Sequence, residues 1–597
     1  MKKIHSVIFT FIVCVTLLSC KDSFVEQQPI GGFGESAITT PEGINMALTG
    51  AYSTLNGDGD MNRGPGNILF GSIRGGEAHK GSVNGDQPQM IEIQKFAVNA
   101  GNSSVTNNFI FYYDAVYRTN LVLANLPNVE GLTDAQKTQI AAEARFLRGH
   151  YHFLLKILFG NIPYIDETNI GDPRVPNTDE SGNFVDAWPS IAADFKFAAD
   201  NLAPTNTDLG RVNKWAAMAY LGKTYLYMGN FGDDSNYTLA KTAFDDVIAN
   251  GVTNKGVKYD LNADYHANFN NLTENGPEAV FAVQHSVNDG STGNAANASR
   301  DLQYISPQSG GGPGDNRGYG FFYPSQWFVN HFRVDANGLP ILDDAARNAA
   351  KIKSDDGIAA GDPFTPDAGL IDPRLDWSVA RRGIPFLDYG LMPGSTWVRS
   401  QADAGPYISH KFFTSKASNG LAASSPFNNL NINVIRFADV LLMAAEVEAR
   451  IGSLTTAQGY VNRVRRRMTV NTTSKENWVQ KLDGSGPAAN YRIAEYPVGA
   501  PQFSSKANAL KAIFFERTLE LGLEGFRAYD AVRFGAEDGV TDLAELNGYI
   551  AYESSLKGYL SGGVYTRVPD AIMPIPQQAI DNSFKDGKYT LTQNPDY

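Results

Sequence analysis

The stretch "TDAQKTQIAAEARFLRGHYHFLLKILFG", residues 133–160, has the clearest helical pattern in the chain. Thr133 followed by Gln136 three residues later is a capping box, a signal that begins helices. Apolar side chains then recur at steps of three and four, which places them on one face of a helix: Ile140, Ala144, Leu147, Tyr151, Leu154 and Leu158. The pattern predicts one long amphipathic helix over these residues.

Further helices precede and follow this stretch. Residues 105–127, "VTNNFIFYYDAVYRTNLVLANLP", predict a helix that ends before Pro127. Because only a short loop separates it from Thr133, the two helices are expected to form an antiparallel hairpin. Earlier still, "TTPEGINMALTGAYSTLNG" (39–57) has a threonine cap followed by proline at the first helical position.

The same arrangement of paired helices recurs at intervals along the chain. The predicted members are residues 187–204 with 211–230, and residues 433–453 with 455–468. Small residues such as Ala216, Ala217 and Gly222 allow neighbouring helices to approach closely. Pairs of this kind are typical of tetratricopeptide-type units, here separated by long insertions. The sequence therefore predicts a mainly α fold in which helix pairs form a scaffold.

Residues 256–430 have a different composition. Glycine, proline, asparagine and aspartate are frequent, as in "SPQSGGGPGDNRGYG", and short strands such as "EAVFAVQHS" are expected among loops. Long loops on a rigid scaffold are where binding usually occurs. We therefore expect this irregular, loop-rich region to bind the ligand.

The N-terminus has the pattern of a secretion signal. Lys2 and Lys3 precede a short apolar run, residues 7–18, that is too short to span a bilayer but suits a signal-peptide core. "LLSC" has the form of a bacterial lipobox. We expect residues 1–19 to be removed as a signal peptide and residues 20–34 to form a tether.

In this interpretation Cys20 is acylated and attaches the protein to a membrane without a spanning helix. The other cysteine, Cys14, lies in the removed segment, so the mature chain would have no disulfide and would depend on a large core. The alternative is an ordinary secretory signal with a chance cysteine.

Charge and motifs exclude several functional classes. The formal net charge of −13 leaves no surplus of lysine and arginine for nucleic acid. The eight histidines are scattered, and no His-Glu-x-x-His, Cys-x-x-Cys or Gly-x-Ser-x-Gly occurs. We therefore predict no catalytic residue, no metal and no cofactor, although counting acidic residues cannot eliminate a glycosidase pair.

The helices of the C-terminal half, the last of which is predicted over residues 514–535, are rich in charge. Arginine and carboxylate residues alternate there at helical spacing, which favours a structural ion-pair network over an active site. The residues concerned are Arg436, Asp439, Glu446, Arg463, Arg465, Glu516, Arg517, Glu520, Glu524, Arg527, Asp530 and Arg533.

Five segments, in order along the chain, together resemble the SusD/RagB family of outer-membrane lipoproteins. They are "SCKDSFVEQQP" (19–29), "AEARFLRGHYHFLLKILFGNIPYI" (142–165), "NVIRFADVLLMAAEVEAR" with "VNRVRRRM" (433–450 and 461–468), "FFERTLELGLEGFRAYDAVRFG" (514–535), and "IMPIPQQAIDNS" with "LTQNPDY" (572–583 and 591–597).

The resemblance implies a single SusD-like domain over residues 35–597, with helical repeats in 35–255, the irregular binding insert in 256–430, and repeat helices and a tail in 431–597. It also implies a lipid-anchored glycan-binding protein on the outer membrane, facing the cell exterior. Such a protein captures oligosaccharide and delivers it to a SusC-like TonB-dependent transporter.

Candidate ligand-binding residues lie in a polar, glycine-rich loop, "GSIRGGEAHKGSVNGDQPQ" (71–89). They are Arg74, Lys80 and Asp86; the alternative is that these side chains hold the loop to itself. The resemblance adds Phe96, which lies near the place where the family often presents an aromatic platform.

Aromatic side chains give further candidates, because flat rings cover the C–H faces of sugars. In "RGYGFFYPSQWFVNHF" (317–332), Trp327 stands where the family has a polar residue, so we expect it to face solvent. Tyr319, Phe322 and Tyr323 precede it, and about half of these rings are expected to be buried. Trp397 lies in a polar loop.

Arg381, followed by Arg382, could donate paired hydrogen bonds to hydroxyls or a ligand carboxylate. The alternative for Arg381 is an internal salt bridge with Asp372 or Asp376. At the level of function, the alternatives to glycan capture are peptide or other nutrient binding, a surface glycan hydrolase, and a structural lid without a ligand.

Overall fold

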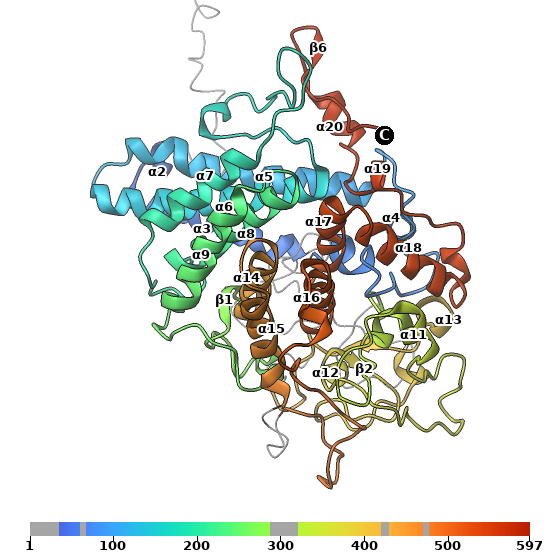
Figure 1. The fold of residues 1–597 in the computed structure, drawn as a ribbon. Coiled ribbons are helices and arrows are strands. Elements are labelled where there is room, and N and C mark those ends of the chain that lie inside the picture. Colours follow the sequence, from blue (N-terminus) through green and yellow to red (C-terminus); the bar gives the residue numbers. More distant parts are fainter. Residues whose placement is uncertain (1–34, 60–66, 287–319, 419–428, 470–476) are drawn as a thin grey trace, which may run out of the picture.

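The computed structural model describes residues 35–59, 67–286, 320–418, 429–469 and 477–597. Within these residues the chain is mainly helical, and its few short strands form two-stranded sheets (Figure 1). This confirms the predicted fold class. The predicted signal peptide and tether, including Cys20, lie outside the described residues, and so does Tyr319.

Helices of the N-terminal half pack against one another in chain order. α5 contacts α6 and α7 contacts α8, as the sequence pairs predicted, and α6 also contacts α7 and α8 contacts α9. The helices of this half are α2 (Glu35–Ile38), α3 (Pro41–Tyr52), α4 (Gln89–Gln94), α5 (Ser103–Asn125), α6 (Asp134–Phe159), α7 (Trp188–Asn201), α8 (Lys214–Asn230) and α9 (Asn236–Asn250).

The local signals read from the sequence account for where these helices begin. Thr133 and Gln136 form the capping box at the start of α6. Thr40 caps α3 by accepting a hydrogen bond from the Gly43 amide at 3.0 Å, with Pro41 in the first turn. The apolar stripe of α6 is buried, apart from the half-buried Leu154.

The elements of the C-terminal half complete the scaffold. α14 packs against both α9 and α16 and so joins the two halves of the chain. The elements of the C-terminal half are α14 (Phe437–Ile451), α15 (Leu454–Thr469), α16 (Lys506–Leu521), α17 (Arg527–Asp538), α18 (Thr541–Ser554), α19 (Arg567–Asp570), α20 (Gln577–Asn582), and the hairpin of β5 (Phe584–Lys585) and β6 (Lys588–Tyr589).

A strand replaces the first turn of one predicted helix. β4 (Ile432–Arg436) pairs antiparallel with β1 (Ala279–Val283), and α14 begins only at Phe437. The prediction of a helix from Asn433 is therefore wrong by one turn, because backbone pairing with a distant strand outweighs local helical preference.

The predicted helix over residues 514–535 is divided into α16 and α17. Leu523 and Gly525 between them have φ angles of +66° and +85°, which end a right-handed helix. Gly525 lies directly against Gly71, since a Cβ on Gly71 would stand 1.9 Å from the Gly525 carbonyl oxygen. The break therefore allows the C-terminal helices to pack closely against the N-terminal segment around Gly71.

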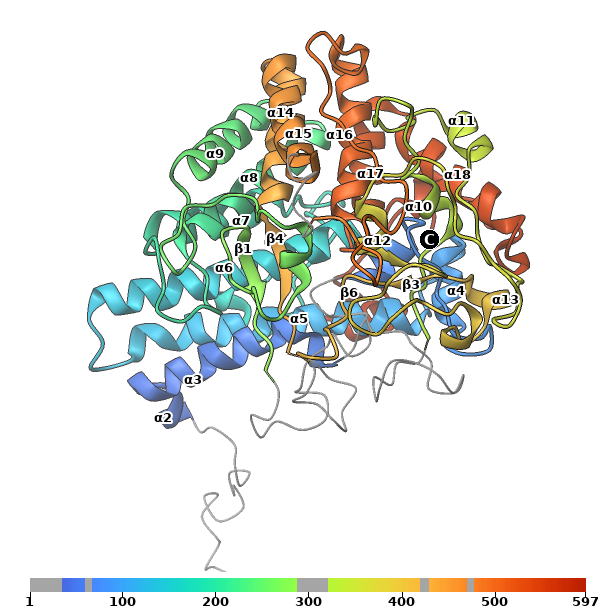
Figure 2. The same ribbon diagram turned by 90° about the horizontal axis from the view of Figure 1, so that it is seen from below.

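The described part of residues 256–430 contains helices of at most six residues. Its residues 320–418 lie on the side of α18 and α4, whereas β1 lies beside β4 (Figure 2). Its elements are β1, α10 (Gln326–Asn330), α11 (Asp344–Ala349), α12 (Arg374–Ser378), α13 (Gln401–Ala404), and the pair β2 (Val379–Ala380) and β3 (Ile408–Ser409).

Buried ion pairs tie the C-terminal helices together, as the charge pattern predicted. Arg436 lies 2.7 Å from both Glu278 and Glu520, and Arg517 lies 2.7 Å from both Asp439 and Asp530. These side chains are buried, so each charge is compensated by a partner rather than by water.

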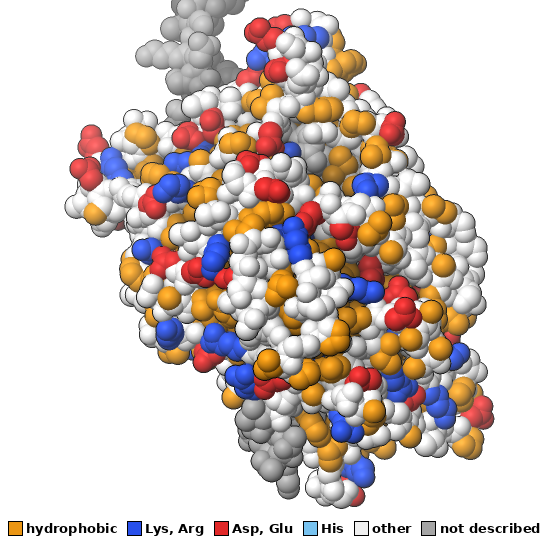
Figure 3. Space-filling model, viewed as in Figure 1, with side chains coloured by type: hydrophobic (Ala, Val, Ile, Leu, Met, Phe, Trp, Pro, Cys, Tyr) orange, Lys and Arg blue, Asp and Glu red, His pale blue; other side chains and the backbone are white. Residues whose placement is uncertain are grey.

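On the surface, positively and negatively charged side chains are interspersed over the face shown in Figure 3. Among the described helices, none is both long enough and apolar enough to cross a membrane.

Candidate functional site

Residues 77–82 and 320–325 lie side by side and fix the predicted N-terminal loop. Four backbone hydrogen bonds join them: His79 N to Tyr323 O at 2.7 Å, Phe322 N to Lys80 O at 2.9 Å, Ser325 N to Glu77 O at 2.9 Å, and Ser82 N to Gly320 O. Gly81, with φ of +81°, approaches so closely that a Cβ would stand 2.5 Å from the Gly320 carbonyl oxygen. Two candidate segments that are far apart in sequence are therefore neighbours.

Lys80 and Asp86 hold this loop to itself, which is the alternative considered from the sequence. Lys80 Nζ donates to the backbone carbonyls of Val83 and Asp86 at 2.8 and 2.6 Å. Burial lowers the pKa of Lys80 to about 8, against the effect of the Asp86 carboxylate. Arg399, which the sequence did not single out, donates to Ser82 Oγ at 2.5 Å and to Asp86 Oδ2 at 3.2 Å.

Arg74 and Arg381 point into the protein, so their predicted availability to a ligand is wrong. Arg74 Nη2 donates to the carbonyls of Asp570 and Ala571 and so holds the C-terminal segment. Arg381 Nε donates to Asp376 Oδ1 at 2.6 Å, the internal salt bridge that the sequence offered as the alternative. Both guanidinium groups compensate buried acceptors instead of facing solvent.

The candidate aromatic rings are also in the core. The expectation that Trp327 faces solvent is therefore wrong, and Phe322 and Tyr323, of which about half were expected to be buried, are both buried. Those that the structure describes are each at most 8% exposed: Phe96, Phe322, Tyr323, Trp327 and Trp397. They do not form an aromatic platform on the surface.

Trp327 shows the physical reason. It lies on the short helix α10, whose residues are all buried, with the Arg527 guanidinium 4.7 Å from its ring centroid and Tyr549 5.9 Å away. Trp397 packs edge-on against Phe386 at 5.7 Å. Large rings contribute most stability when they are buried. The polar neighbours of Trp327 in sequence, Ser325 and Gln326, are buried with it.

A surface pocket of about 380 Å³ lies next to the fixed loop; we call it the α18 pocket. Five parts of the chain meet there: His79, Gln326, residues 351–356, residues 405–406, and the C-terminal end of α18 with the residues after it. Its polar lining consists of His79, Gln326, Lys351, Lys353, Ser354, Asp356, Tyr552, Glu553 and Lys557. The volume falls in the range of about 300–1,000 Å³ found for small-molecule sites.

The inner wall of the α18 pocket is a fixed hydrogen-bond network. Glu553 Oε1 accepts from the Trp327 amide at 2.6 Å, and Glu553 Oε2 lies 3.1 Å from His79 Nε2. His79 Nδ1 lies 3.0 Å from the Tyr559 hydroxyl, and burial raises the pKa of Tyr559 well above its usual value. This wall is rigid, so the pocket is formed before any ligand enters.

The outer wall carries lysines. Lys351 and Lys353 are exposed, while Ile352 between them is buried. Lys557 Nζ donates to Asp356 Oδ2 at 2.8 Å and to the Gln401 carbonyl at 2.6 Å. The alternation of lysine and isoleucine in residues 351–353 is a strand-like signal that could have marked the two lysines as exposed on one side.

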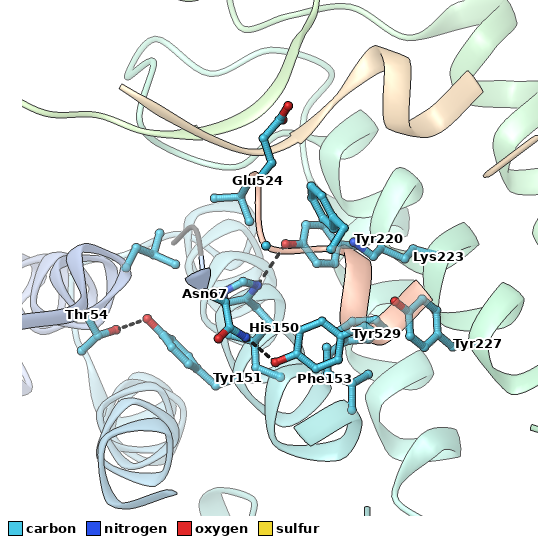
Figure 4. Close-up of a pocket in the computed structure, with 16 residues that line it drawn as sticks. Thr54, Asn67, His150, Tyr151, Phe153, Tyr220, Lys223, Tyr227, Glu524 and Tyr529 are labelled. Atoms are coloured by element: carbon cyan, nitrogen blue, oxygen red, sulfur yellow. Dashed lines mark hydrogen bonds between the residues drawn. The ribbon is translucent and has the colours of Figure 1, made fainter. Parts of the chain in front are cut away.

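Two other hollows are less suited to a sugar. The first, shown in Figure 4, is an internal cavity of about 50 Å³. In it Asn67 Nδ2 donates to the Tyr529 hydroxyl at 2.6 Å, and His150 Nδ1 lies 3.1 Å from the Tyr220 hydroxyl. Burial, aided by the Lys223 charge, lowers the pKa of His150 to about 3. This space admits only water-sized molecules.

The second is a groove of about 760 Å³ between α11, α16, α17 and α18. Charged groups on its rim are already paired: Glu545 with Arg527 at 2.6 Å, Asp344 with Arg347 at 2.7 Å and Lys506 with Glu537 at 3.0 Å. Few polar groups remain there to orient a sugar, so the α18 pocket is the better candidate. The described residues contain no group of three or more His, Cys, Asp or Glu side chains that could hold a metal ion.

The sequence model of the SusD family matches residues 277–597. The chain belongs to the SusD family. A second model, described as "Starch-binding associating with outer membrane", matches residues 32–226 and indicates association with the outer membrane.

Individual SusD relatives are similar to this chain at low identity. A SusD-like protein of Bacteroides ovatus is 26% identical over 45% of this chain, and the match spans only 47% of that protein. SusD-like protein P2 of Formosa agariphila is 25% identical over 88% of this chain and 90% of its own length. Surface glycan-binding protein A of Bacteroides thetaiotaomicron, solved in complex with laminarihexaose, is 20% identical with a TM-score of 0.59, over 93% of this chain and 99% of that one.

These matches confirm the family resemblance and the mainly helical SusD-like fold with paired helices. SusD family proteins are non-catalytic glycan-binding proteins, in agreement with the prediction that this chain is not an enzyme.

Proposed function

We propose that this protein is a cell-surface glycan-binding lipoprotein that captures oligosaccharides and delivers them to a SusC-like TonB-dependent transporter. Membership of the SusD family supports glycan binding. The observation that carries the proposal for this chain is the α18 pocket, a ligand-sized surface hollow with a fixed inner wall and exposed polar groups. A related structure holds laminarihexaose, which supports oligosaccharide as the ligand class.

The proposed place of action is the outer face of the outer membrane. The lipobox pattern ending at Cys20 supports acylation there, with residues 1–19 removed and residues 20–34 as the tether. Several acyl chains on one residue give stable attachment, at about 0.8 kcal/mol for each buried CH₂. Residues 35–597 would then form the single water-exposed SusD-like domain that meets both glycan and transporter.

Affinity electrophoresis tests the binding function. The mature protein is run through native gels that contain one polysaccharide each, with serum albumin as the non-binding control. We expect at least one polysaccharide to retard it, with a Kd between about 1 μM and 1 mM, because a shallow polar site gives modest affinity. After incubation with that polysaccharide, we expect no new reducing ends.

Two results would contradict the proposal. If no polysaccharide retards the protein while peptides bind it, the chain is a peptide-capturing member of the family. If reducing ends accumulate and the activity follows the purified protein, it is a surface hydrolase.

A further inference from the structure

The α18 pocket has an excess of hydrogen-bond donors on its exposed side. Among the described residues, the Lys351 ammonium makes no hydrogen bond or ion pair. Lys353 Nζ donates one hydrogen bond, to the Thr365 carbonyl at 2.7 Å, and lies 4.8 Å from the centroid of the Phe364 ring. Lys557 Nζ uses two donors, on Asp356 and Gln401. Because an ammonium has three N–H donors, Lys351 retains three, Lys353 two and Lys557 one.

Acceptors in the same pocket are largely occupied. Both carboxylate oxygens of Glu553 are engaged, by the Trp327 amide and by His79. Gln326 Oε1 accepts from the Tyr407 hydroxyl at 2.8 Å. Of the lining carboxylates, only Asp356 has an oxygen that no described donor reaches, because Lys557 holds the other.

A ligand for this pocket must therefore supply acceptors and negative charge. Neutral hydroxyls can accept from lysine, but a carboxylate or a sulfate ester also carries a charge opposite to that of the ammonium, which adds Coulomb attraction to the hydrogen bond. The rest of the chain opposes an anion, since the formal net charge is −13, so attraction has to come from the lysines close to the ligand.

We propose that the α18 pocket selects glycans that carry anionic groups, either uronate carboxylates or sulfate esters, and that Lys351 and Lys353 are the selecting residues. This inference rests on the proposed glycan-binding function and narrows its ligand class. Lys557 and Asp356 position the pocket wall, because their mutual ion pair fixes both side chains.

Isothermal titration of the mature protein tests the selection. The probes are an α-1,4-linked galacturonic acid trimer, a sulfated galactose trimer, the neutral galactose trimer and a glutamate pentapeptide. We expect at least one anionic trimer to bind at least tenfold more tightly than the neutral trimer, and its affinity to fall as sodium chloride is raised. Comparison of the two anionic trimers distinguishes carboxylate from sulfate.

The variant Lys351→Ala with Lys353→Ala should lose at least tenfold in affinity for the anionic trimer and should lose less affinity for the neutral one, whose hydroxyls carry no charge. Both side chains are exposed, so the fold should not change. The matched control is Lys481→Ala with Lys588→Ala, which removes the same charge from two exposed lysines outside the pocket and should bind as the wild type does.

The failures can be told apart. Equal affinity for anionic and neutral trimers, or equal loss in the pocket and control variants, overturns the anionic selection and leaves glycan binding intact. Tighter binding of the glutamate peptide than of every sugar overturns the assignment to glycans. No binding of any sugar in either this experiment or the gels overturns the proposed function and the inference together.

Discussion

Glu446 is a buried carboxylate held between two arginines. Arg533 Nη1 lies 2.5 Å from Glu446 Oε2, and Arg450 Nη2 lies 2.7 Å from Oε1. Burial alone would raise the pKa of Glu446, but the two guanidinium groups outweigh it and lower the pKa from 4.5 to about 2. The folded state therefore binds the proton less well than the unfolded chain does.

This lowered pKa predicts acid lability. Glu446 contributes its full stabilisation above the unfolded pKa and loses it as pH falls from about 4.5 to about 2, a loss of about 3 kcal/mol. Urea unfolding as a function of pH should show a flatter profile for Glu446→Gln in this range than for the wild type. Glu495→Gln, which alters an exposed pair with Arg466, should follow the wild type. Parallel profiles for Glu446→Gln and the wild type would contradict the account.

Trp327 is 1% exposed, so we expect it to stabilise the fold rather than to contact a ligand. Trp327→Ala should lower the free energy of unfolding by about 3–5 kcal/mol, because it removes a large buried ring and leaves a cavity. Tyr117→Ala is the matched control, since Tyr117 is 48% exposed, and should change stability by less than about 0.5 kcal/mol. Chemical denaturation measures both. If Trp327→Ala keeps wild-type stability but binds oligosaccharide more weakly, Trp327 lies on the surface and contacts the ligand, and its burial is contradicted.

At this scale, sequence reasoning identified residue types but not their surroundings. The spacing of arginines and carboxylates predicted the ion pairs, because charged side chains that recur at helical steps lie on one face of each helix in a pair. The environment of Trp327 depends on Arg527 and Tyr549, about 200 residues later in the chain, and nothing in the residues beside it reports that contact.

At the junction between α16 and α17, Gly525 lies directly against Gly71 of the N-terminal half. A Cβ on Gly71 would stand 1.9 Å from a backbone oxygen of Gly525, where no side chain can move aside. Gly71→Ala should therefore cost about 1–3 kcal/mol or more in unfolding free energy.

The control is a glycine in an open helical position. Nothing lies within 4 Å of a Cβ on Gly459 in α15, so Gly459→Ala should stabilise the protein by about 0.5–1 kcal/mol. Thermal or urea unfolding of both variants decides the point. If Gly71→Ala is as stable as Gly459→Ala, the two segments are not in close contact.

Helices with local signals were predictable and the junction was not. α6 begins where its capping box and apolar spacing placed it, because both signals lie within the helix itself. The division after Leu521 was missed because apolar residues continue at helical spacing through the glycines. Contacts with distant residues fix the turn: Gly525 lies against Gly71, the Leu523 amide donates to Glu77 Oε2 at 2.9 Å, and the Gly525 amide donates to Ser72 Oγ at 3.1 Å.

For the whole molecule, attachment to the membrane depends on Cys20. Cells that express Cys20→Ala should release the protein from the outer-membrane fraction and should fail to incorporate labelled palmitate into it. Cys14→Ala is the control, because the predicted cleavage removes that residue, and it should remain labelled and membrane-bound. Equal labelling of Cys20→Ala and the wild type would exclude the lipobox interpretation.

The family and its architecture could be predicted from five ordered segments, since each is a local pattern. The α18 pocket could not, because Lys351, His79 and Lys557 meet only after three distant parts of the chain fold together. Within the predicted loop at residues 71–89, His79 lines the pocket, whereas Lys80 and Arg74 are buried.

The central claim is that this chain holds a glycan in the α18 pocket without cleaving it. A crystal structure of the mature protein, grown with the anionic trimer that binds most tightly, tests this most directly. The account predicts an intact sugar in the pocket, with its acidic group within hydrogen-bond distance of Lys351 or Lys353. An intact sugar bound elsewhere while the pocket holds only solvent, or a cleaved sugar in the pocket, would contradict it.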